Sequence, residues 1–182
     1  MSLAVPVGPE DHIQGPVNAP LTLVEYADYE CPYCGDAHVV VKRLQDELGP
    51  RLRFVFRNFP LTQVHPHAQL AAEAAEAAGA QNRFWEMHDR LYENQAALGP
   101  ELIGAVAQGL GLDMERFEED LASGQFRERV ERDFMGVYAA ACQGPRHFSS
   151  MASVMTAPPM KLPFWVRYKQ QHNVVSRVAR LV

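Results

Sequence analysis

The sequence predicts an α/β fold in which a helical segment is inserted after a first strand–helix–strand unit. Residues 21–26 (LTLVEY) form an apolar run with the length of a buried strand, and residues 52–56 alternate between apolar and polar as a second strand does. Residues 32–48, between these strands, carry apolar side chains at helical spacing. Further helical stretches follow from residue 66 onward, so the two strands come before most of the helices.

The strand–helix–strand unit follows a segment rich in proline and glycine, residues 1–20, which we expect to be an extended arm. The helix of the unit is expected to end at Gly49-Pro50, because glycine favours helix ends and proline cannot continue a helix. A single helix between two strands makes the strands parallel, in a right-handed βαβ unit.

The inserted segment is predicted to hold helices at residues 66–78, 82–94 and 100–110, a short turn capped by Asp113, and a last helix from about residue 124 through 134. Phe84, Trp85 and Met87 are interpreted as the core of this insertion. We therefore divide the chain into residues 1–62 (arm and βαβ unit), 63–135 (helical insertion) and 136–182 (an atypical basic tail).

Composition indicates a globular protein of ordinary hydrophobic and charged content in 182 residues, enough for a full core. The chain begins without a basic segment and a long apolar run, and no stretch approaches the roughly 20 apolar residues of a membrane span. The expected location is therefore cytoplasmic, without a membrane partner. The three cysteines are too few for a disulfide-stapled scaffold, which favours a catalytic or metal-binding role for a CxxC pair.

The motif Cys31-Pro32-Tyr33-Cys34 stands at the junction of the first strand and the first helix. Cysteines three residues apart in a first helical turn lie on one face, close enough to form a small disulfide ring. Unpaired backbone N–H groups and the helix dipole favour an anion at that end, so the Cys31 thiolate is stabilised. This arrangement predicts a thiol–disulfide redox site.

Five sequence blocks resemble the DsbA-like branch of the thioredoxin superfamily. They are TLVEY (22–26), ECPYC (30–34), FVFRNFPL (54–61), HPHA (65–68) and FWEMH (84–88), and the likeness covers residues 11–135. The resemblance implies a thioredoxin-like fold with an inserted helical domain. It also implies a protein disulfide oxidoreductase that exchanges its CxxC dithiol or disulfide with protein or small-thiol substrates, without a dissociable cofactor.

The same resemblance assigns roles to the residues of the motif. Cys31 would attack a disulfide, Cys34 would resolve the mixed disulfide, and Pro32 and Tyr33 would set the local geometry and redox poise. Glu25 would accept the proton of Cys34 from the preceding strand; the alternative is a partly exposed strand carboxylate without such a role.

Residues 136–182 lack the segment that the family places next, a GTPTFFING-type cis-proline loop followed by a hairpin and a last helix. This tail contains six basic and no acidic residues, whereas all 22 acidic residues precede Gly136. If the third base of each codon is joined to the first two bases of the next, the genetic code permits the missing motif from Ala141-Cys142 to Met151-Ala152. Our hypothesis is that the tail is a frame-shifted translation of the family's C-terminal segment, which the coding DNA would decide.

Three other interpretations stay open at this stage. Cys31, Cys34 and His38 fall on one helical face, and His65 or His67 could complete a structural zinc site, although no metal is the favoured expectation. A thioredoxin-like chain without the cis-proline loop could also serve as a binding or scaffold protein. Nucleic acid is not an expected partner, because the tail cations lack interleaved aromatic residues and binding-motif spacing.

Overall fold

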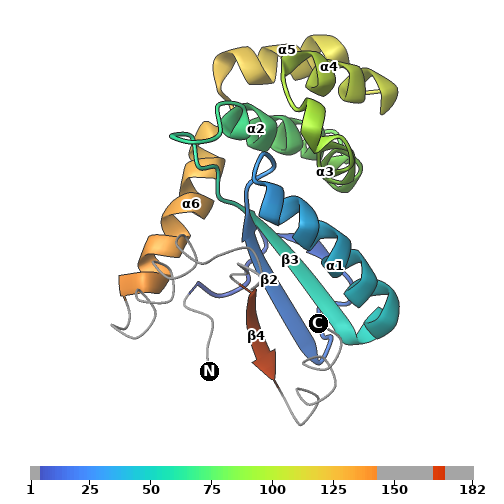
Figure 1. The fold of residues 1–182 in the computed structure, drawn as a ribbon, viewed down its shortest axis with the longest axis vertical. Helices are drawn as coiled ribbons and strands as arrows, with labels where there is room; N and C mark the ends of the chain where they lie inside the picture. The colour runs from blue at the N-terminus through green and yellow to red at the C-terminus, as the bar shows by residue number, and fades with distance from the viewer. Residues whose placement is uncertain (1–4, 143–165, 171–182) are drawn as a thin grey trace.

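A small mixed β-sheet lies at the centre of the protein (Figure 1). The structure is a computed structural model that describes residues 5–142 and 166–170. Within these residues the strand order is β1-β3-β2-β4, with β1 at His12–Gln14, β2 at Leu21–Ala27, β3 at Leu52–Asn58 and β4 at Val166–Gln170. β2 and β3 are parallel, as predicted, and β1 and β4 are antiparallel to their neighbours. The thioredoxin-like α/β fold class is confirmed.

The N-terminal segment is not wholly an extended arm. Its residues His12–Gln14 form β1, which pairs with β3 in a register that places His12 opposite Phe56. β1 forms there because the backbone N–H and C=O groups on the outer edge of the buried strand β3 need hydrogen-bond partners. A strand this short has no hydrophobic alternation of its own to predict it.

Helix α1 (Pro32–Leu48) connects β2 to β3 and has the predicted bounds. It buries Ala37 and Val41 against the sheet side of the core, and it ends at Gly49, whose positive φ of 49° favours glycine. In Figure 1, α1 lies along one side of the sheet and α6 along the other.

The helical insertion, apart from α6 alongside the sheet, gathers beyond the carboxyl ends of β2 and β3 (Figure 1). It contains α2 (Ala68–Gly79), α3 (Phe84–Glu93), α4 (Pro100–Gly109), α5 (Met114–Ser123) and α6 (Arg127–Cys142). The turn predicted at Asp113 is instead a full helix, α5, and the Asp113 side chain caps it by accepting a hydrogen bond from the Arg116 N–H.

The core spans the sheet and the insertion without a break. Helix α2 supplies its middle with fully buried alanines at positions 71, 74, 75, 77 and 78. Small side chains let α2 approach α3 and α5 closely, so the helix is buried almost all round. Met87 and Leu91 of α3 complete this contact, as the sequence predicted for the aromatic and methionine stripe.

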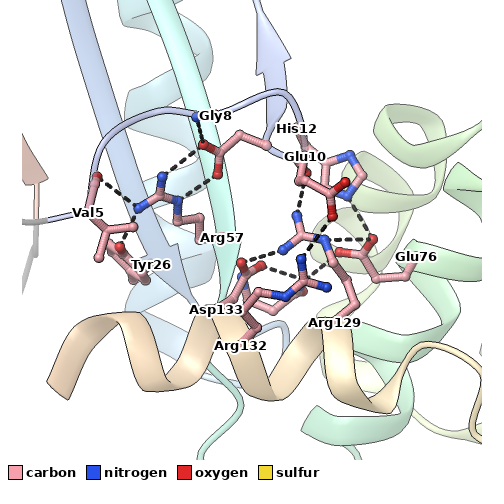
Figure 2. A network of polar contacts seen from close by, with 12 residues as sticks. Val5, Gly8, Glu10, His12, Tyr26, Arg57, Glu76, Arg129, Arg132 and Asp133 are labelled. Atoms are coloured by element: carbon pink, nitrogen blue, oxygen red, sulfur yellow. Dashed lines mark hydrogen bonds and ion pairs between the residues drawn. The ribbon is translucent and has the colours of Figure 1, made fainter. Parts of the chain in front are cut away.

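Polar contacts join the N-terminal segment to β3 and α6 (Figure 2). Arg57 donates two hydrogen bonds to Asp11, at 2.6 and 2.8 Å, and a third to the Tyr26 hydroxyl at 2.6 Å. Arg129 pairs with Asp133 at 2.5 Å and donates to the backbone oxygen of Glu10 at 2.7 Å. Figure 2 shows these groups converging from four separate parts of the chain.

Helix α6 continues through residue 136 to Cys142, across the boundary drawn between insertion and tail. Further along the tail, β4 pairs with β2 and places Val166 opposite Glu25. Residues 143–165 and 171–182, where a cis-proline loop, a hairpin and a last helix would be sought, lie outside the described residues.

Candidate active site

The CxxC motif lies at the junction between the end of β2 and the start of α1, at the edge of the sheet that faces the insertion. Cys31 is the N-cap residue of α1 in extended conformation, and Pro32 occupies the first helical position, where a missing N–H costs nothing. The N–H groups of Cys34 and Gly35 donate to the Cys31 carbonyl, at 2.9 and 3.1 Å, and close the first turn. Both thiols are free and partly exposed, and Tyr33 beside them is 51% exposed.

The two thiols differ sharply in acidity. A hydrogen bond from Cys34 lowers the pKa of Cys31 to about 6, despite partial burial, and the backbone N–H groups of Cys34 and Tyr33 contribute in the same direction. The negative Asp28 nearby opposes this shift. The same thiol pair, together with burial, raises the pKa of Cys34. Cys31 is therefore the thiolate of the pair and Cys34 the protonated thiol.

Asp28 organises the turn that leads into the motif. Its side chain is only 2% exposed, and it accepts hydrogen bonds from the N–H of Glu30, the N–H of Leu61 and the Nδ1 atom of His65, at 2.7 to 2.8 Å. The partners of Asp28 lie up to 37 residues away, and no local pattern indicates them.

Glu30 accepts a hydrogen bond from the backbone N–H of His67 at 2.6 Å. His67 is the N-cap residue of α2, so this bond ties the start of the insertion to the active-site turn. The two histidines of the HPH step thus hold the insertion against the motif, one through its side chain and one through its backbone.

Gln95, in the 3₁₀ turn after α3, is a site residue that the sequence did not indicate. Its side-chain amide donates to the carbonyl groups of Tyr29 and Cys31, at 2.7 and 2.9 Å. Gly35 makes room for it, because a Cβ at Gly35 would lie 2.5 Å from Gln95 Oε1. A glycine directly after the CxxC motif was the one available signal of such a close approach.

Glu25 is buried in the centre of β2, with 4% of its surface exposed, so the alternative of a partly exposed carboxylate is wrong. Burial raises the pKa of Glu25 to about 8. The negative charge of Glu25 also contributes to the raised pKa of Cys34, which places the carboxyl group within electrostatic reach of that thiol. The structure thus brings a buried acid with a raised pKa to the inner side of the CxxC pair.

The structure does not assemble the zinc ligand set that the sequence left open. His65 is engaged by Asp28 and lies at the start of α2. His38 points toward His88 and Asp89 of α3, and these three residues form a cluster of potential ligands within the described part of the chain, without either cysteine. Within the described residues, neither cysteine belongs to a group of three potential metal ligands.

The order of the strands, the motif at the start of α1 and the helical insertion define a DsbA-like fold of the thioredoxin superfamily. The chain belongs to the thioredoxin family, whose sequence model matches residues 8–142. Among solved structures, a thioredoxin-like oxidoreductase from Silicibacter pomeroyi is 27% identical and covers 75% of each chain, with a TM-score of 0.59. BdbD from Bacillus subtilis, 22% identical with a TM-score of 0.66, covers 89% of this chain and 83% of its own, and shows the same fold.

Curated relatives match the chain over only a part of their own length. Na(+)/H(+) antiporter NhaA 1 of Salinispora arenicola is 47% identical over 149 residues, which are 81% of this chain and 23% of the antiporter. NhaA 3 of Salinispora tropica is 50% identical over 134 residues, 73% of this chain and 20% of the relative. The chain thus spans less than a quarter of the length of these relatives. Among its described helices, none has both the length and the apolar character needed to cross a membrane.

Proposed function

We propose that this chain catalyses dithiol–disulfide exchange through Cys31 and Cys34. The observation that carries the proposal is the unequal thiol pair at the start of α1: a partly exposed Cys31 whose pKa is lowered to about 6, next to a protonated Cys34. A thiolate at neutral pH is the attacking species in disulfide exchange, and a protonated neighbour is held ready to resolve the product. The solved relatives with this fold support the general class of oxidoreductase for the chain.

The reaction conserves atoms and electrons as follows. The Cys31 thiolate attacks one sulfur of a substrate disulfide, forms a mixed disulfide and releases the other substrate sulfur as a thiolate. Cys34 then loses its proton, attacks Cys31 Sγ and releases the second substrate thiolate. Two electrons pass from the Cys31–Cys34 dithiol to the substrate, and the chain is left with an internal disulfide. The reverse sequence oxidises a substrate dithiol.

Glu25 is proposed to take the proton that Cys34 must lose. With a pKa of about 8, Glu25 is ionised in a minority of molecules at neutral pH, and this ionised form, whose share grows with pH, is the one that can accept the proton. Pro32 and Tyr33 are proposed to tune the redox poise through the backbone between the thiols. Substrates would be proteins or small molecules that carry thiols or disulfides, and the cysteine pair would need no separate cofactor.

An insulin-reduction assay, paired with a dithiol-oxidation assay, tests this function on the full chain. Cys31→Ser should abolish both activities, whereas Cys142→Ser, which removes the only cysteine outside the motif, should leave both unchanged. Activity that survives Cys31→Ser would remove the enzyme assignment.

A second candidate is a thioredoxin-like binding or scaffold protein with impaired redox activity. It rests on the sequence of residues 136–182, in which the family's cis-proline motif is not recognisable. In that case the wild-type chain would show no exchange above the Cys31→Ser background, while Cys34→Ala would still bind disulfide-containing peptides without forming a mixed disulfide. A trapped mixed disulfide with Cys34→Ala would instead support the enzyme.

A further inference from the structure

A second cluster of reactive side chains lies between α1 and α3, one helical turn beyond Cys34. It consists of His38 from α1 and His88 and Asp89 from α3, and one potential ligand atom from each lies within 4.8 Å of the other two. His38 Nε2 is 3.7 Å from Asp89 Oδ1. Both histidines are buried, at 8% and 2% exposure. The redox reaction proposed above makes no use of this cluster.

Asp89 presents one carboxylate oxygen to the cluster and the other to Lys42. Its Oδ2 atom accepts a hydrogen bond from Lys42 Nζ at 2.5 Å. Its Oδ1 atom is buried and makes no hydrogen bond with any residue that the structure describes. An acceptor of this kind is uncommon, because buried polar atoms are nearly always paired. It faces His38 at a distance too long for a hydrogen bond and suitable for a shared ligand.

His88 is held in a fixed orientation by the core. Its Nδ1 atom lies 3.0 Å from the Tyr29 hydroxyl, and its ring contacts Phe56 and Tyr92 edge-on. With Nδ1 engaged by Tyr29, Nε2 is the nitrogen that remains for a further bond. Metal-binding histidines typically hold their second ring nitrogen in this way, with a hydrogen bond that orients the ring and selects the tautomer.

We propose that His38, His88 and Asp89 form a binding site for a divalent transition metal ion of the zinc type. Two imidazole nitrogens and one carboxylate oxygen are a ligand set that zinc accepts, with water in the fourth position. Ligand atoms at tetrahedral positions around zinc lie about 3.3 Å apart, so the widest separation in the cluster, at most 4.8 Å, must contract by up to about 1.5 Å to bind the ion.

Burial lowers the pKa of both histidines, which keeps them neutral and able to donate a lone pair. The opposing charge is Lys42, which sits on the far oxygen of Asp89 and weakens the attraction for a cation. The alternative, in which both histidines are only core residues and bind no ion, leaves the buried Asp89 Oδ1 without a hydrogen-bond partner among the described residues. The site differs from the zinc centre that the sequence left open, since it shares only His38 with that set.

Cobalt(II) titration of the full chain tests the proposal, because Co²⁺ substitutes for Zn²⁺ and its visible absorption reports the ligands. All three cysteines are changed to serine first, so that the thiols cannot bind the ion. We expect one Co²⁺ per chain, displaced by Zn²⁺. His38→Gln and Asp89→Asn should each weaken binding about tenfold or more, since even changes beyond the direct ligands cost that much.

Two further variants separate a metal site from a structural role. His67→Gln removes a histidine outside the cluster and should leave the affinity unchanged. Lys42→Gln removes the competing cation and should tighten binding, which loss of a merely structural ion pair would not do. Circular dichroism establishes that each variant is folded; His88→Gln is avoided because His88 is buried in the core. Unsaturable binding, or equal affinity in the cysteine-free parent and in its His38→Gln and Asp89→Asn variants, would overturn the proposal.

Discussion

At Cys31 the immediate neighbours, rather than the residue type, set the chemistry. A cysteine in water is mostly protonated at neutral pH, whereas Cys31 receives a hydrogen bond from Cys34 and faces the N–H groups at the start of α1. Asp28, buried behind the motif, acts against this stabilisation and yet holds the turn together through three hydrogen bonds. The Asp28 carboxylate therefore stabilises the structure of the turn and at the same time limits how far the pKa of Cys31 is lowered.

Removal of the Cys34 donor should raise the pKa of Cys31. In a Cys142→Ser background, the rate of alkylation by iodoacetamide should rise with pH through an inflection near 6. Cys34→Ala should move this inflection up toward the ordinary thiol value, because the hydrogen bond to the thiolate is lost. Cys34→Ser is the matched control, since its hydroxyl still donates, and should shift it less. An inflection that stays near 6 in Cys34→Ala would contradict the assignment.

The buried carboxyl of Glu25 should make the protein less stable as pH rises from about 4.5 to about 8. In this window the unfolded chain ionises Glu25 while the folded chain keeps it protonated, so folding takes up a proton. Each pH unit should cost roughly 1.4 kcal/mol of unfolding free energy, up to the folded pKa. Glu25→Gln should remove this loss.

Urea unfolding at pH 5 and pH 8 measures the effect of Glu25. The change in unfolding free energy between the two pH values should be more favourable in Glu25→Gln than in the wild type. The comparison is made between the two proteins because the lowered pKa of Cys31 makes both of them more stable as pH rises from about 6 to 9. This contribution cancels in the difference. Equal pH dependence in the two proteins would show that Glu25 is not buried in its protonated form.

Among the elements, the short 3₁₀ turn after α3 (Gln95–Ala97) has an effect larger than its size. It carries Gln95, whose amide bonds two carbonyl groups of the CxxC turn and so couples the insertion to α1. Together with the His65–Asp28 and His67–Glu30 contacts, it makes the insertion a support for the active-site turn rather than a separate appendage.

Gln95→Ala should destabilise the protein by about 1 to 2 kcal/mol, because two hydrogen bonds to partly buried carbonyl groups are lost. Gly35→Ala should also destabilise it, since the new Cβ would displace the Gln95 side chain. In the double variant the two effects should not add, because the displaced group is already absent. Urea unfolding of the four proteins gives the coupling energy, and strict additivity would refute the contact.

At the scale of the whole molecule, the N-terminal segment, the sheet and α6 are held together by the network in Figure 2. Arg57 and Asp11 are its most buried ion pair, with side chains 4% and 7% exposed. The pair joins β3 to the segment before β1 across 46 residues of sequence. The pair thereby holds the N-terminal segment against β3.

Asp11→Ala should cost about 3 to 5 kcal/mol, because it leaves the Arg57 guanidinium buried without its counter-charge. Asp11→Ala combined with Arg57→Met should recover a large part of this loss, since the uncompensated charge is then gone. Arg83→Ala, which breaks an exposed pair with Glu86, is the matched control and should change stability by less than about 1 kcal/mol. Thermal or urea unfolding checks all three, and a small loss for Asp11→Ala would contradict the burial of the pair.

The parts of the fold that could be predicted are those with a local signal. The parallel β2 and β3, the bounds of α1 and most of the insertion follow from hydrophobic period and from glycine and proline at the ends, which act within a few residues. β1 was missed because a three-residue strand carries no period and depends on the free edge of β3. The length of α5 was underestimated because only its cap and two apolar residues marked it.

Local sequence was sufficient to place two thiols at the start of a helix and an acid on the strand before them, because these relations span at most nine residues. Tertiary structure decided which charges lie inside: Glu25 and Asp28 are buried, Gln95 reaches the motif, and His38 meets His88 and Asp89. These contacts join residues far apart in the chain, and burial and pairing depend on how elements pack. Local spacing therefore sets the acidity of Cys31 through Cys34, whereas desolvation and long-range hydrogen bonds, which spacing does not encode, determine the raised pKa of Glu25 and the fixed turn around the motif.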